Sequence, residues 1–213
     1  MKRIKLILLL CCCILVAACG HDIWSLGSNN ANEWPHPGEK NTFFPEGEIS
    51  QQDKVLYARQ LEALGENSLY REQLPEELFV YRLTVLPQNG NPFVIRIVIN
   101  REEKTGNYIY KRADGIGMGE IGSILVTQNV PLGTAECEAV MDVIDLKKFW
   151  YLPGVKEGDG DRWILEGADA NRYYITTRGN PTTSSSVVYI GLQWIDMGKS
   201  LDAYLSTYYD RID

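Results

Sequence analysis

Histidine is nearly absent from this sequence of 213 residues, which contains only His21 and His36. Both lie before Ser50, where we expect the folded domain to begin. A domain without histidine cannot build a Ser-His-Asp or Cys-His catalytic site or a histidine-ligated zinc site. The sequence therefore predicts no catalytic residue, no metal site and no cofactor.

Apolar runs long enough to cross a membrane are also missing. The most prominent run, Leu6 to Ala18, has 13 residues, whereas a membrane-spanning helix needs about 20. Lys2, Arg3 and Lys5 stand before it. A charged start followed by a short apolar run is typical of an export signal, so we expect residues 1–18 to be cleaved.

Cysteine is scarce outside this N-terminal segment. Of the five cysteines, Cys11, Cys12 and Cys13 lie inside the apolar run, where cysteine acts as a small hydrophobic residue. Only Cys19 and Cys137 follow it. If Cys19 is modified, Cys137 has no disulfide partner within the chain, even in an oxidising compartment.

The residues Val16-Ala17-Ala18-Cys19 resemble the lipobox of bacterial lipoproteins. The resemblance implies cleavage before Cys19, a diacylglyceryl thioether on its sulfur and a further acyl chain, such as palmitate, on the new amine. Two or more chains form a stable anchor, since each buried CH₂ contributes about 0.8 kcal/mol. Gly20 follows instead of aspartate, which in this family implies the periplasmic face of the outer membrane. The alternative is a plain signal peptide without lipid.

The chain has fewer basic than acidic residues. The chain has 21 Lys+Arg against 28 Asp+Glu, and loss of residues 1–18 leaves 18 against 28, a net charge of −10. Such an acidic chain is a poor partner for nucleic acid and for anionic lipid headgroups. The charge suits a basic protein partner in the periplasm, or serves solubility alone.

Residues 19–49 form the expected tether between the lipid and the domain. The segment is rich in proline, glycine, asparagine and serine and has no sustained periodicity, which is typical of a linker. Its aromatic residues are expected either to dock on the domain or to touch the membrane, and docking is favoured for Phe43 and Phe44.

Residues 50–213 are predicted to form a single α+β domain. The expected architecture is an antiparallel meander of about four strands plus a second hairpin, covered by two or three helices. Asn89-Gly90 is a strong hairpin signal between the first two runs. The six expected strands are the two of the hairpin over 78–100, the single strands over 107–113 and 122–128, and the two of the hairpin over 163–177.

Two helices have clear boundary signals. Ser50 with Asp53 predicts the start of the first helix, and Gly65 predicts its end. Thr134 is expected to cap a second helix over 135–150, with Cys137 on the face that covers the meander. A buried, unpaired thiol is inert by default.

The C-terminal region is expected to contain a serine-rich loop, a β-prone run beginning at Val187, and a closing helix. The helix is predicted from apolar and aromatic residues at helical spacing, which are Leu201, Tyr204, Leu205 and Tyr208.

Residues 78–198 resemble a family of uncharacterised bacterial proteins in which Phe-Trp-x-Leu-Pro precedes an Asp-Gly turn and Trp-x-Leu-Glu-Gly. The sequence departs from that pattern at Tyr174, where the family has histidine, and at Gly179-Asn180, where it has Trp-Ser. The resemblance supports the fold and implies no activity. The matching residues are Phe149, Trp150, Leu152, Pro153, Asp159, Gly160, Trp163, Leu165, Glu166, Gly167 and Tyr173.

Three charged residues stand among apolar neighbours in the predicted strands: Arg82, Arg96 and Glu166. An isolated charge at such a position would be very costly. We therefore expect Glu166 to meet Arg82, Arg96 or both in a partly buried network. Such a network either binds an anion or another ligand, or is an ion pair that fixes the packing of the second hairpin on the meander, which is the favoured alternative.

Two loop motifs are candidate sites. The glycines of 114–122 are favoured as a turn between strands over a phosphate cradle, because β-rich residues follow and no lysine does. Glu157, Asp159 and Asp161 alternate, but the twelfth position of a calcium loop would be Ala168. An exposed acidic turn is the favoured interpretation. A glycosidase-type carboxylate pair of Asp159 or Asp161 with Glu166 stays an open alternative.

The function predicted from the sequence is a lipid-anchored, non-catalytic module of the outer membrane that binds a protein or cell-wall component. A narrower alternative is an immunity-type inhibitor that neutralises a toxin delivered to the periplasm. An alternative of another class is a carboxylate-dependent hydrolase, which requires Asp159, Asp161 or Glu166 to converge in an open cleft.

Overall fold

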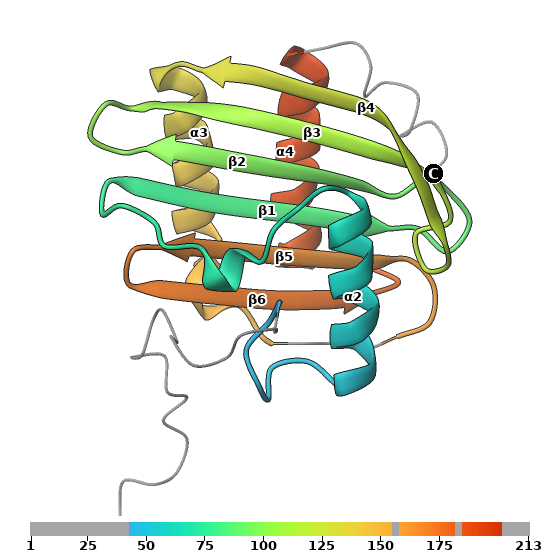
Figure 1. Cartoon of the computed structure of the whole chain (residues 1–213). Helices are drawn as coiled ribbons and strands as arrows, with labels where there is room; N and C mark the ends of the chain where they lie inside the picture. The colour runs from blue at the N-terminus through green and yellow to red at the C-terminus, as the bar shows by residue number, and fades with distance from the viewer. Residues whose placement is uncertain (1–42, 155–157, 182–184, 202–213) are drawn as a thin grey trace, which may run out of the picture. The chain divides into compact units, whose positions relative to one another are not determined.

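The computed structural model describes residues 43–154, 158–181 and 185–201, which form a six-stranded antiparallel sheet with helices on both faces (Figure 1). This is the α+β class expected from the sequence. The strands are β1 (Leu78–Leu86), β2 (Phe93–Asn100), β3 (Thr105–Gly115), β4 (Ile121–Leu132), β5 (Arg162–Asp169) and β6 (Arg172–Gly179), the α-helices are α2 (Gln51–Ala63), α3 (Thr134–Leu146) and α4 (Ser186–Leu201), and the 3₁₀ helices are η1 (Leu69–Arg71) and η2 (Phe149–Tyr151).

The sheet joins the meander to the second hairpin through its central strands. The strand order is β4-β3-β2-β1-β5-β6, so β1 pairs with β2 on one side and with β5 on the other. In this register Arg82 lies opposite both Arg96 and Glu166. Side chains alternate between the two faces of a strand, so these three residues share one face.

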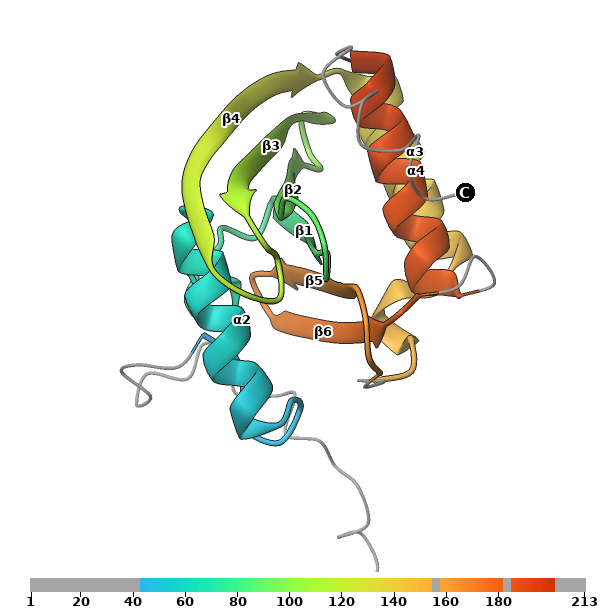
Figure 2. The ribbon, with the colours of Figure 1, turned by 90° about the vertical axis from the view of Figure 1, so that its right-hand side faces the viewer.

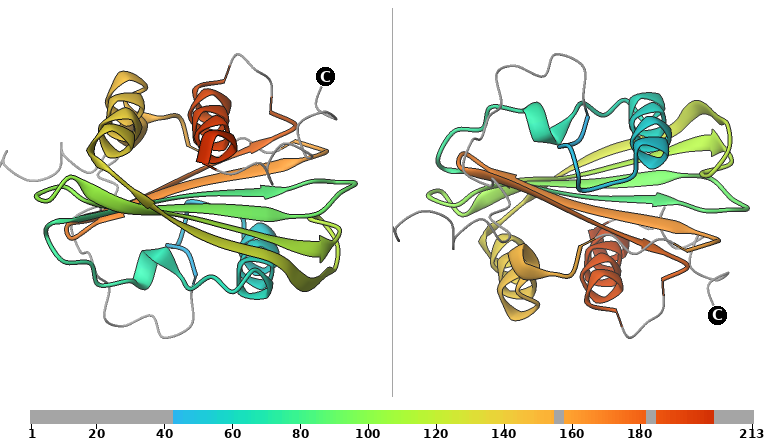
Figure 3. Two further views of the ribbon diagram at one scale, coloured as in Figure 1. Left: turned by 90° about the horizontal axis from the view of Figure 1, so that it is seen from above. Right: turned by 90° about the horizontal axis from the view of Figure 1, so that it is seen from below.

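The helices form two layers, one on each face of the sheet. Seen edge-on, α3 and α4 run side by side on one face, while α2 lies on the other (Figure 2). The views from above and below show η1 on the same face as α2 (Figure 3). Central strands such as β1 are therefore buried on both faces.

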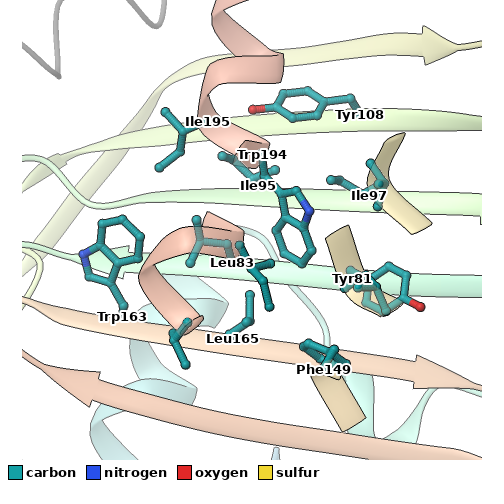
Figure 4. Close-up of a cluster of buried hydrophobic side chains, with 14 of the residues drawn as sticks. Tyr81, Leu83, Ile95, Ile97, Tyr108, Phe149, Trp163, Leu165, Trp194 and Ile195 are labelled. Atoms are coloured by element: carbon teal, nitrogen blue, oxygen red, sulfur yellow. The ribbon is translucent and has the colours of Figure 1, made fainter. Parts of the chain in front are cut away.

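The larger core lies between the sheet and α3 and α4. Tyr81 is at its centre, with ring centroids 5.4 Å from Phe149 and 5.9 Å from Trp194, and it has no exposed surface. Figure 4 shows the strand side chains directed toward Trp194 and Ile195 of α4. This core includes Cys137, which is 2% exposed, as expected from the helix periodicity.

The second core lies under α2 and includes residues that precede Ser50. Phe44 and Ile49 are 1% and 5% exposed and pack in a cluster with Tyr57 and Leu61. The Ser68 hydroxyl donates a hydrogen bond to the Phe43 carbonyl (2.8 Å). The end of the expected tether thus docks on the domain, the favoured of the two alternatives.

Helix α2 begins and ends where the sequence signals place it. The Ser50 Oγ accepts a hydrogen bond from the Asp53 backbone N–H (3.2 Å). Gly65 follows the last turn with a positive φ of 67°, a conformation that favours glycine.

Helix α3 differs from the prediction at both ends. Its N-cap is Gly133, not Thr134, which is the first helical residue, and the Glu136 carboxylate accepts a hydrogen bond from the Gly133 N–H (3.1 Å). The helix stops at Leu146, because Lys148 takes a left-handed conformation (φ 49°) before η2.

The prediction of a β-prone run from Val187 is wrong, since these residues form α4. Tertiary packing overrides their β propensity: the buried side chains recur at helical spacing and face the sheet. Leu201 ends this helix, whereas Tyr204, Leu205 and Tyr208 lie outside the described residues. The buried residues are Val187, Val188, Ile190, Gly191, Trp194, Ile195 and Gly198.

The glycine-rich segment forms the turn between β3 and β4. The carbonyl of Gly119 accepts hydrogen bonds from Arg59 (3.1 Å) and Gln60 (2.7 Å) of α2, so the turn is held against that helix. None of the helices in the described ranges is long and apolar enough to span a bilayer.

Candidate functional site: a buried charge network

Arg82 and Glu166 form the ion pair expected from the sequence. Arg82 Nε lies 2.7 Å from Glu166 Oε2, and Arg82 Nη2 lies 2.8 Å from Oε1. Neither side chain has exposed surface. The two parallel hydrogen bonds make a bidentate contact, the strongest geometry available to a guanidinium and a carboxylate.

The remaining contacts of Arg82 are to the loop between α2 and η1. Its Nη1 donates to the Asn67 carbonyl (2.7 Å) and lies 3.3 Å from Glu66 Oε2. Glu66 is nearly as buried as Arg82, with 2% of its side chain exposed. The guanidinium therefore joins two carboxylates, one from β5 and one from this loop.

Two further cations complete the network. Arg96 Nη1 lies 3.4 Å from Glu66 Oε2, and Arg96 Nη2 lies 2.6 Å from Glu72 Oε2. Lys111 of β3 donates to Glu66 Oε1 (2.7 Å) and to the Gly65 carbonyl (2.7 Å). Arg96 thus contacts the loop carboxylates and not Glu166.

The electrostatics keep Glu66 ionised. Burial alone would raise the pKa of this carboxyl, but Arg82, Lys111 and Arg96 together outweigh burial and lower the pKa below its ordinary value. Burial likewise disfavours charge on Arg82, yet Glu166 and Glu66 outweigh it and raise its pKa. Glu66 and Arg82 are thereby held in their ionised forms.

Tyr173 of β6 completes the surroundings of Glu166. Its hydroxyl donates a hydrogen bond to Glu166 Oε1 (2.8 Å). Burial, followed by the neighbouring Glu166, raises the pKa of this phenol well above its ordinary value, so the hydroxyl stays a donor. Glu166 therefore accepts three hydrogen bonds and has no exposed oxygen with which to contact a substrate.

The network is balanced in charge, and its central pair is fully buried. Its three cations, Arg82, Arg96 and Lys111, face three carboxylates, which are Glu66, Glu72 and Glu166. A ligand would have to displace one of these partners from a buried position, at the cost of leaving a charge unpaired. Of the two alternatives read from the sequence, this arrangement favours structural ion pairs over a ligand site.

The structural consequence of the network is the attachment of the loop after α2 to the sheet. Glu66 comes from that loop and Glu72 from the end of η1, and their partners come from three adjacent strands. A shift of one residue in the β1–β5 pairing would move Arg82 into the apolar core on the opposite face. The network therefore fixes both the loop and the strand register.

A second polar cluster lies at the end of η2, on the face of α3 and α4. Arg178 donates to the carbonyls of Gly154 (2.6 Å) and Pro153 (2.9 Å), and Thr176 Oγ1 also donates to Pro153 (2.8 Å). The Tyr174 hydroxyl donates to the Leu152 carbonyl. Tyr174, where the resembled family has histidine, thus holds the segment that follows η2.

The acidic turn divides into two roles. The Asp161 carboxylate accepts a hydrogen bond from the Gln88 N–H (2.8 Å) and so fixes the β1–β2 turn. Asp159 is exposed and lines an open pocket that also contains Arg162. Glu157 lies outside the described residues.

Sequence reasoning missed four members of the network: Glu66, Glu72, Lys111 and Tyr173. The two glutamates lie in an irregular loop, where no periodicity identifies a buried position. Lys111 and Tyr173 lie on the same sheet face as Arg82, but this becomes evident only once the order and register of five strands are known. The one signal that the sequence offered was a lysine, Lys111, in the middle of a predicted strand.

The sequence matches no protein-family model and no curated protein. The family resemblance of residues 78–198 and the lipobox resemblance therefore stay predictions.

Proposed function

We propose that this chain is a lipoprotein of the bacterial cell envelope, anchored through acylated Cys19 at the periplasmic face of the outer membrane, whose domain acts by binding a protein. The observation that carries the anchor is Val16-Ala17-Ala18-Cys19 at the end of a short apolar run with a basic start. Residues between Cys19 and Phe43 give the domain reach from the lipid.

Binding is favoured over catalysis by the groups that the domain offers. It contains no histidine, and Glu166 is enclosed by Arg82 and Tyr173. Asp161 is engaged by a backbone N–H. A carboxylate-dependent hydrolase would then depend on Asp159 without a second free carboxylate from this set, whereas such enzymes use two.

The surface that best suits a protein partner is the end of α3 with η2. Leu146 and Tyr151 are 69% and 84% exposed there, next to the exposed acidic residues Asp142 and Asp145. Exposed apolar and aromatic side chains are typical of protein-binding surfaces. Lys147 and Lys148 lie between the aspartates and Tyr151, so the local charge is mixed. The basic partner follows instead from the net charge of −10 expected after loss of residues 1–18.

Metabolic labelling with a palmitate analogue tests the anchor. We expect the wild-type chain to carry label and to fractionate with the outer membrane, and Cys19→Ala to lose both. Cys137→Ala is the matched control, because it removes the other cysteine that follows the expected cleavage site. Label that persists in Cys19→Ala, or is lost in Cys137→Ala, would overturn the lipid anchor.

Affinity capture from envelope extracts tests the partner surface. The full chain in detergent should retain one saturable basic protein, which mass spectrometry identifies and purified components rebind. Tyr151→Ser should abolish that binding, whereas Val55→Ser, an equally drastic change at a residue 62% exposed on the opposite face, should not. If the captured protein were a toxin, the function would be that of an inhibitor. Equal capture by both variants would contradict the proposal that this surface binds the partner.

A further inference from the structure

Arg162, at the start of β5, is a buried arginine without a partner among the described residues. The residue is 8% exposed, and its Nε and Nη1 atoms are fully enclosed yet have no hydrogen-bond acceptor in the described part of the chain. Arg82, by contrast, uses its three nitrogens in hydrogen bonds. An unpaired buried guanidinium is costly, and the described residues leave the charge of Arg162 uncompensated.

The arginine lines an open pocket of about 620 Å³, which is within the range of small-molecule sites. The start of α2 lies on its other side, so the partial positive charge of a 13-residue helix also acts there. The lining residues are Ser50, Gln52, Asp53, Gly158, Asp159 and Arg162.

The backbone holds the guanidinium in place. Arg162 pairs in register with Gly179 of β6, and a Cβ atom on Gly179 would collide with Arg162 Nη1 and with the backbone of Gly158. Glycine at this position lets both groups approach the strand. The guanidinium of Arg162 is therefore held against Gly179 beside the pocket, on the face opposite α3 and α4.

The other lining groups define the charge of the ligand. Asp53 Oδ2 accepts a hydrogen bond from the Ser50 hydroxyl (2.9 Å), and Asp159 makes no hydrogen bond or ion pair with another described residue. A simple anion would meet repulsion from these two carboxylates, and a simple cation would meet repulsion from Arg162 and the helix start. A ligand that carries both charges satisfies both sides.

We propose that this pocket binds a small zwitterion of the α-amino-acid class, with its carboxylate on Arg162 and its ammonium group between Asp53 and Asp159. Arg162 supplies the positive charge that attracts the carboxylate. Asp159, on the surface, supplies the opposite charge at the mouth of the pocket. This site is independent of the lipid anchor and of the protein-binding surface at α3.

Calorimetric titration of the full chain in detergent tests the proposal with three matched probes. Alanine carries both charges, N-acetylalanine only the carboxylate, and alaninamide only the ammonium group. We expect alanine to bind at millimolar concentration and each analogue to bind at least about tenfold more weakly, since each leaves one charge of the pocket unpaired. Dialanine, whose charges are farther apart, distinguishes a free amino acid from the termini of a short peptide.

Two variants assign the charges. Arg162→Gln should abolish the binding of alanine. Asp159→Asn should lower the affinity for alanine and raise the affinity for N-acetylalanine, a reversal of selectivity that misfolding cannot produce. Arg112→Gln is the matched control, because Arg112 also has an enclosed Nε without an acceptor among the described residues but does not line the pocket.

Three results would overturn the proposal. They are the absence of binding by either alanine or dialanine, equal binding of alanine and N-acetylalanine, and loss of binding in Arg112→Gln to the same extent as in Arg162→Gln. Binding of N-acetylalanine alone would identify a plain anion site instead.

Discussion

Arg82 and Glu166 face each other across β1 and β5 in a bidentate ion pair, with Nε–Oε2 and Nη2–Oε1 distances of 2.7 and 2.8 Å and no exposed surface on either side chain. They are 84 residues apart in the sequence. The pair therefore joins the meander to the second hairpin within the β1–β5 ladder, which links these two parts of the sheet.

Removal of one partner should be strongly destabilising. Glu166→Ala leaves Arg82 buried with only Glu66 as a counter-charge, and such a change costs about 3–5 kcal/mol of unfolding free energy. Urea denaturation of the full chain in detergent measures the loss. Glu72→Ala is the control, because that carboxylate is 33% exposed and its loss should cost about 1 kcal/mol or less. Equal losses in the two variants would contradict the importance of the buried pair.

Replacement of both partners should be less harmful than replacement of one. The double variant Arg82→Met with Glu166→Leu removes both charges and keeps most of the volume, and such replacements of a buried pair are often close to neutral. We expect the double variant to be more stable than Glu166→Ala by the same denaturation measurement. A double variant less stable than either single would show that Glu66 and Tyr173 depend on the charged pair.

Stability should fall in acid through Glu66. The pKa of Glu66 in the folded protein is lower than its ordinary value of 4.5, so its ionised form stabilises the fold above about pH 4.5, and this contribution is lost as the pH falls through the folded-state pKa. The stability difference between wild type and Glu66→Gln should therefore be largest near pH 7 and shrink below pH 4.5. Glu62→Gln, an exposed change on α2, should give a curve parallel to that of wild type.

The sequence predicted the elements whose boundaries carry local signals. Ser50, Gly65 and Asn89-Gly90 each fix a helix end or a turn through the chemistry of a few neighbouring residues, and the structure confirms all three. The alternation of Trp163 and Glu166 between two faces also followed from the period of a strand.

The failures have a different origin. The run from Val187 is rich in β-branched and aromatic residues, and only its packing against β5 and β6 makes it a helix. The partners of Glu66 come from three strands that lie side by side next to one loop, and no local sequence pattern predicts that arrangement. Arg162 likewise differs from the paired strand arginine Arg82 in having no acceptor among the described residues, which is a property of the folded chain.

Cys137 should be unreactive in the folded chain. The thiol is 2% exposed, and burial, followed by the neighbouring Glu136, raises its pKa, so both access and the thiolate fraction are low. Labelling of Cys137 by a maleimide is measured as the labelling of wild type minus that of Cys137→Ser. We expect its rate to be at least about 100-fold lower in buffer than in urea. Rapid labelling without denaturant would contradict the position of α3 on the sheet.

The close packing of η2 against β5 depends on Gly167. A Cβ atom there would collide with the Phe149 ring and lie 3.1 Å from Tyr81, and both rings are fully buried in the larger core. Because this core has no room to move them, Gly167→Ala should lower the unfolding free energy by about 1–3 kcal/mol. Gly154→Ala, at a glycine with nothing within 4 Å of the added atom, should leave the denaturation midpoint unchanged. If the two variants were equally stable, η2 could not lie against β5 as the structure places it, because the same added methyl group would then find space at both positions.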